Sequence, residues 1–568
     1  MKVVAFLSDK KIEHQVIIFN EQTMSTKIKR GADALVESMQ TAGVSNIFTL
    51  SGNHIMPIFD AVYDHKINLI HTRHEAAAVH MADSWARLTG EIGIAMVTGG
   101  PGHANAVSAL YTAGMAESPL VLLSGHAPNN QLGMGAFQEM AQVDIAAPLT
   151  KASWVCKSVS ELPSDFAKAV SIAKSGRPGP VHISLPSDVL DAAFDGGISM
   201  PKAADFESIP IKADKQVIKE MIAALLKAKK PLVLTGPMMQ SQAGRKVLAR
   251  LEDSLGIPVI GMESPRGIGD PSLGAFSEVL ALSDCVLLLG KKLDFTLKFG
   301  KAPSFHKDCV FLQIDPEMSE IERTKRAVGS SLQLSTCTDT YSAINAIIEL
   351  NGSATKAECE WQTEVHTAIN YRPAAWSSAP SSPNKLHPAQ ALAPLQAILD
   401  SHPESVLVSD GGEIGQWAQA CLHAPNRVIN GVAGSIGAGL PFATAASLAR
   451  PGAPVVAVVG DGTFGFHSSE IDTAVRYQLP FLLIVGNDAC WNAEHQIQIR
   501  EYGQARVIGC ELLPTHYEKV CAAFGGFGEL VTEKEQLLPA AHRAIASKLP
   551  SCLNIMIDGV PAPTIKRS

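Results

Sequence analysis

The stretch that decides the fold is GDGTFGFHSSEIDTAVRYQLPFLLIVGND, residues 460–488. It opens with a glycine-rich turn around Asp461, continues as a helix-like segment, and closes with an apolar strand that ends at Asn487. A second apolar strand precedes the first turn, and parallel strands place their carboxyl ends at the same edge of a sheet. We therefore expect Asp461 and Asn487 to meet one divalent metal ion that also binds a diphosphate.

The residues around the two turns suit such an ion. Mg²⁺ takes oxygen ligands in octahedral geometry, a few from protein and the rest from water and phosphate. The backbone carbonyl of Ala489 is a third candidate ligand. Gly460 and Gly462 let backbone N–H groups approach an anion, and Thr463 adds a hydroxyl. GDG alone is more often an ordinary tight turn, but the strand that ends in Asn-Asp at this separation favours the metal site.

Apolar runs of strand length recur along the whole chain and alternate with helix-like segments. Many end in Gly or Asp, as in VSNIFTLSG, IGIAMVTGG, KPLVLTG, DCVLLLG and SVLVSDGG. This pattern is typical of strands buried on both faces, so we predict an α/β protein with doubly wound parallel sheets. Composition divides the chain into an N-terminal extension and three α/β units separated by linkers. The predicted ranges are 1–23, 24–195, 210–350 and 385–568.

Bulk composition narrows the class of partner. The 568 residues are 46% hydrophobic and carry a net charge of −8, which argues against nucleic acid as the main partner. No run of 18 apolar residues predicts a membrane span. The ten cysteines show no CxxC spacing, and the chain shows no signal peptide. We expect free thiols in a reducing compartment, the cytoplasm, and a small-molecule substrate.

The GDG turn, followed at this separation by an Asn-containing turn, resembles the thiamine diphosphate motif of a large superfamily of decarboxylases, carboligases and lyases. Acetolactate synthase, 2-hydroxyacyl-CoA lyase and oxalyl-CoA decarboxylase are members. The resemblance implies three domains, which bind the pyrimidine, a nucleotide-like group and the pyrophosphate. It also implies that Asp461, Asn487 and the Ala489 carbonyl bind Mg²⁺. Two positions depart from the pattern: Gly486 stands where Asn is common, and Ala489 stands where Gly is common.

The first unit is similar to the family's pyrimidine-binding domain. INLIHTRHEAAAVHMADSWARLTG matches the segment that carries the catalytic Glu, which implies that Glu75 hydrogen-bonds to the aminopyrimidine and helps to remove the C2 proton. By itself, Glu75 could equally be a helix-start residue that complements the helix dipole. The loop MGAFQEMAQVD is similar to one that places Phe137 and Gln138 near the reacting centre. The resemblance also assigns Gly52 to the cofactor.

The third unit is similar to the pyrophosphate-binding domain at two further places. In SDGGEIGQW, Gly411, Gly412 and Glu413 would meet the diphosphate. In GVAGSIGAGLPFATAASL, Gly434 lies beside the cofactor and Ile436 is at the position that wedges its two rings into a V, although Ile in plain core packing is also common. In this family the first domain of one subunit faces the third domain of its partner. A homodimer is then the minimum unit, and a homotetramer is expected.

The middle unit separates the candidate reactions. Its segment GKKLDFTLKFG is similar to 2-hydroxyacyl-CoA lyase and oxalyl-CoA decarboxylase, in which this region holds an adenine nucleotide. Arg266, in a neighbouring loop, is a candidate for a phosphate of CoA or ADP. Lys291, Lys292 and Lys298 are expected to be solvated instead. The acetolactate synthase pattern that accompanies flavin is missing, so FAD is less expected.

The segment ACWNAEHQIQIREYG would line the substrate entrance. Glu494 is proposed to exchange a proton with the leaving carbonyl compound, although a helix-face Glu in water is the alternative. The resulting hypothesis is a 2-hydroxyacyl-CoA lyase that forms formyl-CoA and an aldehyde or ketone, or runs in reverse. The alternative is an acetolactate synthase-like or benzaldehyde lyase-like carboligase acting on 2-oxo acids or 2-hydroxy ketones. A non-catalytic relative is disfavoured by the intact Glu75, Asp461 and Asn487.

Overall fold

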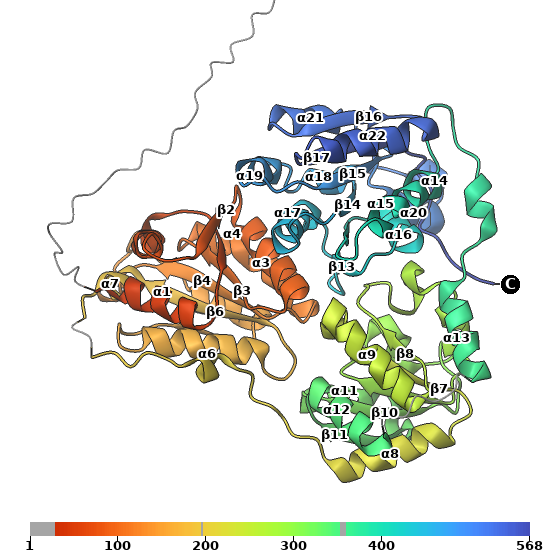
Figure 1. Cartoon of the computed structure of the whole chain (residues 1–568), viewed down its shortest axis with the longest axis horizontal. Coiled ribbons are helices and arrows are strands. Elements are labelled where there is room, and N and C mark those ends of the chain that lie inside the picture. The colour runs from red at the N-terminus through yellow and green to blue at the C-terminus, as the bar shows by residue number, and fades with distance from the viewer. Residues whose placement is uncertain (1–28, 195–196, 353–358, 568) are drawn as a thin grey trace, which may run out of the picture.

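The computed structural model describes residues 29–194, 197–352 and 359–567. The predicted extension, residues 1–23, lies outside this range. The described chain forms three parallel β-sheets in sequence order, each with helices on its faces (Figure 1). The prediction of an α/β fold with three parallel sheets is therefore confirmed. None of the described helices is long and apolar enough to cross a membrane.

The first sheet carries the segment of Glu75. Helices α3 (Glu75–Thr89) and α4 (Pro101–Met115) pack on one face of it through an alanine-rich core. Helices α1 (Gly31–Thr41) and α6 (Leu162–Lys174) pack on the other face. The strands follow one another in space as β2 (Asn68–His71), β1 (Asn46–Thr49), β3 (Gly93–Val97), β4 (Leu120–His126), β6 (Pro180–Pro186) and β5 (Ser153–Val155).

The middle sheet is smaller, and two of its central strands, β7 (Pro231–Thr235) and β9 (Cys285–Leu289), are buried along their whole length. Leu and Val side chains of β7 and β9 fill the cores on both faces. The strands lie in the order β11 (Leu332–Cys337), β10 (Val310–Asp315), β9 (Cys285–Leu289), β7 (Pro231–Thr235) and β8 (Val259–Gly261). The larger helices of this part are α8 (Lys215–Lys227), α9 (Gln242–Leu255), α11 (Met318–Val328), α12 (Thr340–Asn351) and α13 (Glu360–Asn370).

The third sheet contains both turns of the opening stretch. Its strands lie in the order β13 (Asn426–Ile429), β12 (Val406–Ser409), β14 (Val455–Gly460), β15 (Leu482–Asn487), β17 (Ser551–Met556) and β16 (Phe527–Val531). The helices that matter below are α16 (Glu413–Cys421), α17 (Gly439–Ala449), α18 (Asp461–Phe464), α19 (Glu470–Arg476), α20 (Asn492–Tyr502) and α21 (Tyr517–Ala523). The predicted pairing of the two strands is confirmed, because β14 and β15 are parallel neighbours.

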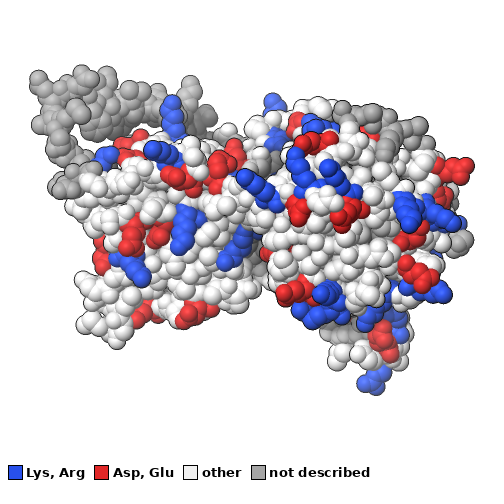
Figure 2. All heavy atoms as spheres, turned by 90° about the horizontal axis from the view of Figure 1, so that it is seen from below, with Lys and Arg blue, Asp and Glu red and all other residues white. Residues whose placement is uncertain are grey.

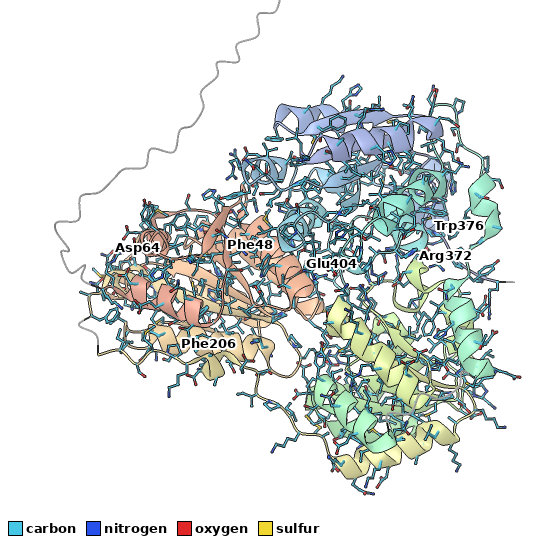
Figure 3. All side chains as sticks on the ribbon, viewed as in Figure 1. Phe48, Asp64, Phe206, Arg372, Trp376 and Glu404 are labelled. Carbon is cyan, nitrogen blue, oxygen red and sulfur yellow. The ribbon has the colours of Figure 1, made fainter. Side chains whose placement is uncertain are left out.

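Direct contacts join the three parts of the chain. Helix α3 packs along α17, and the hydroxyl of Ser84 donates a hydrogen bond of 3.1 Å to the carbonyl of Phe442. Arg372 joins the middle and third parts (Figure 3), because its guanidinium donates to the carbonyls of Ala420 and Ser272 at 2.7 and 3.0 Å. Figure 2 shows basic and acidic side chains interspersed over one face of the molecule. These contacts place the carboxyl ends of the first and third sheets at fixed positions within one chain.

Candidate active site

Asp461 and Asn487 leave the third sheet side by side. Gly460 is paired with Gly486 in the register of β14 and β15, so the next residue of each strand starts from the same level. The Asp461 carboxylate accepts the N–H of Gly462 at 2.9 Å and that of Cys490 at 3.2 Å. The second hydrogen bond ties the carboxylate to the turn that follows Asn487. The two predicted metal ligands are thus brought together by one sheet edge.

A pocket of about 70 Å³ opens above these turns. Its lining brings together residues from four separate segments of the third domain, and most of the predicted cofactor residues are among them. Gly411, Gly434, Asn487 and Ala489 adjoin these segments but do not line the pocket. The lining includes Gly412, Glu413, Ile436, Gly460, Asp461, Gly462, Thr463, Asp488, Trp491 and Glu494. All the lining residues lie between 412 and 494, so the first and middle domains of the same chain contribute none of them.

Glycines in the pocket and directly beside it are required by close packing. Gly411 has φ +108°, and a Cβ there would lie 2.9 Å from the hydroxyl oxygen of Thr463. A Cβ on Gly462 would lie 2.6 Å from the ring of Trp491. Larger residues would therefore fill the space in which backbone N–H groups can approach an anion. Gly434 also has a positive φ, +66°, and lies beyond these four segments, beside Pro265.

The charges of the pocket favour a cation. Burial raises the pKa of Asp461 to about 6. Burial, followed by the charge of Asp461, raises the pKa of Asp488 to about 7. A divalent ion would supply the missing opposite charge and reverse both shifts. The described residues contain no cluster of three or more His, Cys, Asp and Glu side chains suited to a metal. One carboxylate, an amide oxygen and a carbonyl, completed by phosphate and water, fit Mg²⁺.

The backbone conformation at Ala489 is one that favours glycine. Its φ is +58°, in the left-handed region that costs an L-residue about 1–2 kcal/mol. The N–H of Ala489 donates to the side-chain oxygen of Asn487 at 3.2 Å, which closes the turn. The departure from the family pattern noted in the sequence therefore keeps the turn but carries backbone strain.

Glu75 begins α3 at the carboxyl edge of the first sheet and is 8% exposed. The side-chain amide of Asn105 donates to its carboxylate at 3.1 Å. A Cβ on Gly102 would lie 3.4 Å from the same carboxylate, and one on Gly52 would lie 2.4 Å from the side chain of Thr98. The edge is therefore closely packed around the carboxylate. Sequence reasoning missed Asn105 and Thr98, although both lie in VTGGPGHANAVSALYTA, residues 97–113, which follows the third strand.

Phe137 and Gln138 lie at the same edge of the first sheet. The ring of Phe137 stacks on that of His54 at 6.0 Å between centroids and is 67% exposed. His54 in turn contacts the hydroxyl of Thr98 at 3.2 Å. Gln138 has φ +58° and packs on the turn at Gly100. The first-domain residues predicted for the cofactor are thus gathered in one place, with His54 as a further member that the sequence did not indicate.

Within the described chain, this group and the third-domain pocket do not form one site. Glu75 does not line the pocket. The segment before it is attached elsewhere, because the N–H of Arg73 donates to both carboxylate oxygens of Glu470, at 3.0 and 3.2 Å. Glu470 is fully buried on α19, and burial raises its pKa to about 7. Sequence reasoning missed this contact, since nothing in the pattern pairs residues 397 positions apart.

Arg266 lies beside the third-domain pocket. Its guanidinium is 3.7 Å from the carboxylate of Glu413, which lines the pocket, and Pro265 packs near Gly434. Burial raises the pKa of Glu413, and Arg266 opposes that shift.

The prediction that Lys291, Lys292 and Lys298 are solvated needs one correction. Lys291 is buried, not solvated, and donates to the hydroxyl of Thr296 at 2.7 Å.

A larger cavity of about 340 Å³ lies where the three parts of the chain meet. Residues that follow strands of the middle sheet line it, including Met238, Glu263 and Tyr341. Glu117 and Arg427 contribute from the first and third parts. The cavity is therefore placed at the carboxyl ends of the middle strands, where α/β sheets generally bind ligands.

Comparison with known proteins agrees with this geometry. Residues 29–145, 218–335 and 410–555 match models for the N-terminal TPP binding domain, the central domain and the C-terminal TPP binding domain of thiamine pyrophosphate enzymes. The chain is 31% identical to a probable acetolactate synthase of Mycobacterium bovis, over 92% of this chain and 95% of that protein. It is 29% identical to the 2-hydroxyacyl-CoA lyase 2 proteins of Danio rerio and Homo sapiens, over 93% and 91% of this chain and 92% and 88% of theirs. The chain belongs to the thiamine pyrophosphate enzyme family and is a thiamine diphosphate-dependent enzyme of the acetolactate synthase and 2-hydroxyacyl-CoA lyase type.

Proposed function

We propose that this enzyme is a 2-hydroxyacyl-CoA lyase, which cleaves its substrate to formyl-CoA and an aldehyde or ketone or catalyses the reverse condensation. The observation that carries the proposal is a cavity of about 340 Å³ at the carboxyl ends of the middle strands, large enough for part of a nucleotide. The similarity to proteins named 2-hydroxyacyl-CoA lyase 2 over most of the chain supports it.

The chain's own residues divide the work of holding the cofactor. Asp461, Asn487 and the Ala489 carbonyl would hold Mg²⁺. The backbone of the segments at 411–413 and 460–463 faces the diphosphate. Ile436, which lines the pocket, would act as the wedge between the rings of the cofactor, and Gly434 would lie beside them. When bound, thiamine diphosphate supplies a nucleophilic carbon that attacks a carbonyl and accepts the electron pair of the breaking C–C bond.

Proton transfer is assigned to two carboxylates. Glu75 would hydrogen-bond to the aminopyrimidine, and Asn105, which donates to the Glu75 carboxylate, would fix its orientation. Glu494 exchanges a proton with the leaving carbonyl compound. This assignment is supported by its place in the lining of the pocket and by its exposure to solvent. Phe137 and Gln138 shape the space on the first-domain side.

The active site requires two copies of the chain. Glu75 does not line the third-domain pocket of its own chain, and Glu470 holds the adjoining segment against a different part of the third domain. A partner subunit would bring its first-domain edge, with Glu75, over this pocket. A homodimer is the smallest unit that satisfies this arrangement, and a homotetramer of two such dimers is the expected assembly.

We assign the nucleotide part of CoA, or a bound ADP, to the 340 Å³ cavity. The guanidinium of Arg266 lies beside Glu413 of the cofactor pocket. Arg266 would therefore bind a phosphate of CoA at the point where the substrate passes from the 340 Å³ cavity to the cofactor pocket. FAD is less expected. A flavin would give a yellow protein, which makes this part of the proposal simple to check.

A second candidate is a carboligase of the acetolactate synthase type that acts on 2-oxo acids. The position of Arg266 favours it, because a guanidinium next to the cofactor pocket can bind a carboxylate. The 31% identity to a protein named probable acetolactate synthase also supports it. Either reaction would use the same cofactor residues, so substrate is what separates the two.

The deciding experiment begins with mass spectrometry of ligands released from the purified protein. It continues with assays for formyl-CoA from a 2-hydroxyacyl-CoA and for acetolactate from pyruvate, each with added thiamine diphosphate and Mg²⁺. Asp461→Ala serves as the matched inactive control. Formyl-CoA release that exceeds acetolactate formation supports the lyase. Acetolactate formation without turnover of any acyl-CoA would replace the lyase with the second candidate.

A further inference from the structure

We propose that Asn554 and Glu518 are positioning residues that turn the amide oxygen of Asn487 toward the metal. This inference rests on the proposed role of Asn487 as a metal ligand. Asn487 and Asn554 are 0% and 1% exposed and lie on the neighbouring strands β15 and β17. The Asn487 amide nitrogen donates to the Asn554 side-chain oxygen at 3.1 Å. The Asn554 amide nitrogen donates to the Glu518 carboxylate at 2.8 Å.

The direction of this relay follows from Glu518. A carboxylate only accepts hydrogen bonds, whereas an amide has one accepting end and one donating end. Glu518 therefore draws the nitrogen of Asn554 toward itself and leaves the oxygen of Asn554 facing Asn487. Asn487 must then donate to that oxygen through its amide nitrogen, which leaves the amide oxygen of Asn487 on the opposite side. That oxygen faces the turn at Ala489, whose N–H donates to it at 3.2 Å.

Two neighbouring groups enforce the same direction. The carbonyl of Thr515 accepts from the amide nitrogens of both Asn487 and Asn554, at 3.1 and 3.0 Å. If either amide were reversed, an oxygen would face this carbonyl. His516 contacts the other oxygen of Glu518 at 2.7 Å, and since the carboxylate only accepts, the ring nitrogen must be the donor. Every polar contact in the cluster is satisfied with the Asn487 oxygen directed to the metal turn.

Reversal of Asn487 would present an N–H₂ group to Mg²⁺, which binds oxygen ligands. Outer partners of metal ligands commonly change metal affinity by roughly 10–100-fold when they are replaced. The sequence does not reveal this relay, because the three side chains are separated by 31 to 67 positions and meet only through the order of the strands.

The test uses the full-length protein freed of metal with EDTA and supplied with saturating thiamine diphosphate. Mg²⁺ affinity is then measured by titration calorimetry. In Asn554→Asp, repulsion between the new carboxylate and that of Glu518 should move the side chain at 554 away from the amide nitrogen of Asn487. Asn487 is then no longer held in one direction, and Mg²⁺ affinity should fall by roughly 10-fold or more. If only overall charge mattered, the added negative charge would instead strengthen Mg²⁺ binding.

In the double variant Asn554→Asp with Glu518→Gln, the new amide at 518 can donate to the new carboxylate at 554, which restores a hydrogen bond between the two positions. It should recover affinity to within a few-fold of the wild type. Asn554→Ala should weaken binding without being rescued by Glu518→Gln, and it serves if Asn554→Asp does not fold. Asn426→Asp, a change of a buried Asn at the far edge of the same sheet, is the matched control and should bind Mg²⁺ normally.

The outcomes separate the relay from the metal site itself. Asp461→Ala reports on the site, and its loss of Mg²⁺ binding is required for either inference. If Asp461→Ala binds Mg²⁺ normally, the proposed metal site is wrong. If Asp461→Ala loses Mg²⁺ binding but Asn554→Asp and the double variant have the same Mg²⁺ affinity as each other, the relay is wrong and the metal site stands. Thermal unfolding of each variant without metal shows whether the fold is intact.

Discussion

The first and third sheets have the same strand order but different chemistry at their carboxyl edges. In both, the order in space is second, first, third, fourth, sixth and fifth strand of the described domain. After the third strand, the first domain has Thr98 and two glycines, whereas the third domain has Asp461 between two glycines. After the second strand, the first domain has Glu75, whereas the third domain has the glycine-rich segment that leads to Ile436.

This difference shows what the fold leaves open. The parallel sheet determines where ligand-binding loops lie, and the residues that follow each strand determine what those loops bind. In the third domain, acidic and glycine residues suit a metal and an anion. In the first domain, a single carboxylate held by Asn105 suits an exchange of one proton. The two edges are complementary, which is the physical basis for the proposal that they meet across a subunit boundary.

The largest expected effect comes from removing the proton-exchanging group of the first domain. Glu75→Gln should lower kcat by about 10²–10⁴-fold, because the amide cannot take part in proton transfer. Thiamine diphosphate and Mg²⁺ should remain bound, since the third domain holds them. Steady-state kinetics and the cofactor content of the purified variant check both statements. Unchanged kcat would remove Glu75 from the proposed mechanism.

Removing the Asp461 carboxylate of the third domain should instead reduce the binding of Mg²⁺ and of the cofactor. Asp461→Ala should lose Mg²⁺ affinity by roughly 100-fold or more, since even outer partners of metal ligands often contribute up to about this amount. Retention of thiamine diphosphate should fall with it. Equilibrium dialysis against Mg²⁺ and the cofactor measures the loss, and Asp400→Ala, an exposed Asp remote from the pocket, is the control. If Asp461→Ala retained Mg²⁺ and thiamine diphosphate normally, the third-domain edge would not be the metal and diphosphate site.

A smaller effect should appear in the pH dependence of stability, through the contact between the two domains. Burial raises the pKa of Glu470 from its ordinary 4.5 to about 7. The stabilisation that comes from its proton is therefore complete below about pH 4.5 and is lost as the pH rises through 7. Glu470→Gln lacks this titration, so its stability should fall less than that of the wild type between pH 5 and pH 8.

Denaturant unfolding at several pH values, with metal and cofactor removed, measures this difference. Glu139→Gln provides a matched control, because the Glu139 carboxylate also accepts backbone N–H groups, those of Gly133 and Ala136 at 2.6 and 3.1 Å, but within the first domain. These hydrogen bonds lower the pKa of Glu139 from its ordinary 4.5, so it does not titrate between pH 5 and pH 8. The two Gln variants should differ in slope with pH. Parallel slopes for Glu470→Gln and the wild type would show that Glu470 does not titrate in this range.

The smallest effect concerns the metal turn. Ala489→Gly should raise the free energy of unfolding by about 1 kcal/mol, because glycine accepts the left-handed φ without the cost that alanine incurs. The carbonyl ligand is unchanged, so Mg²⁺ affinity should stay within a few-fold of the wild type. Chemical denaturation and Mg²⁺ titration check the two halves of this prediction. A less stable Ala489→Gly protein would contradict the account of strain.

The part of the candidate site that the sequence indicated is local in the chain. Asp461 and Asn487 stand at the ends of two strands joined by one helix, so strand periodicity and turn residues are enough to bring them together. Glu75, Ile436 and Phe137 came only from the resemblance to a family, because a Glu at a helix start or an Ile in a core is common in any α/β protein. Their chemical roles are still predictions.

The sequence by itself determined the α/β class, the parallel sheets and the adjacency of the two metal-turn residues, since each depends on short-range patterns of apolar and turn residues. Only the tertiary structure decided which remote side chains support them. Asn554 and Glu518 reach Asn487 through the strand order of the third sheet, and Glu470 reaches Arg73 through the packing of two domains. Such contacts join residues far apart in the chain, and hydrogen bonding between buried groups depends on their positions in space, which no local pattern records.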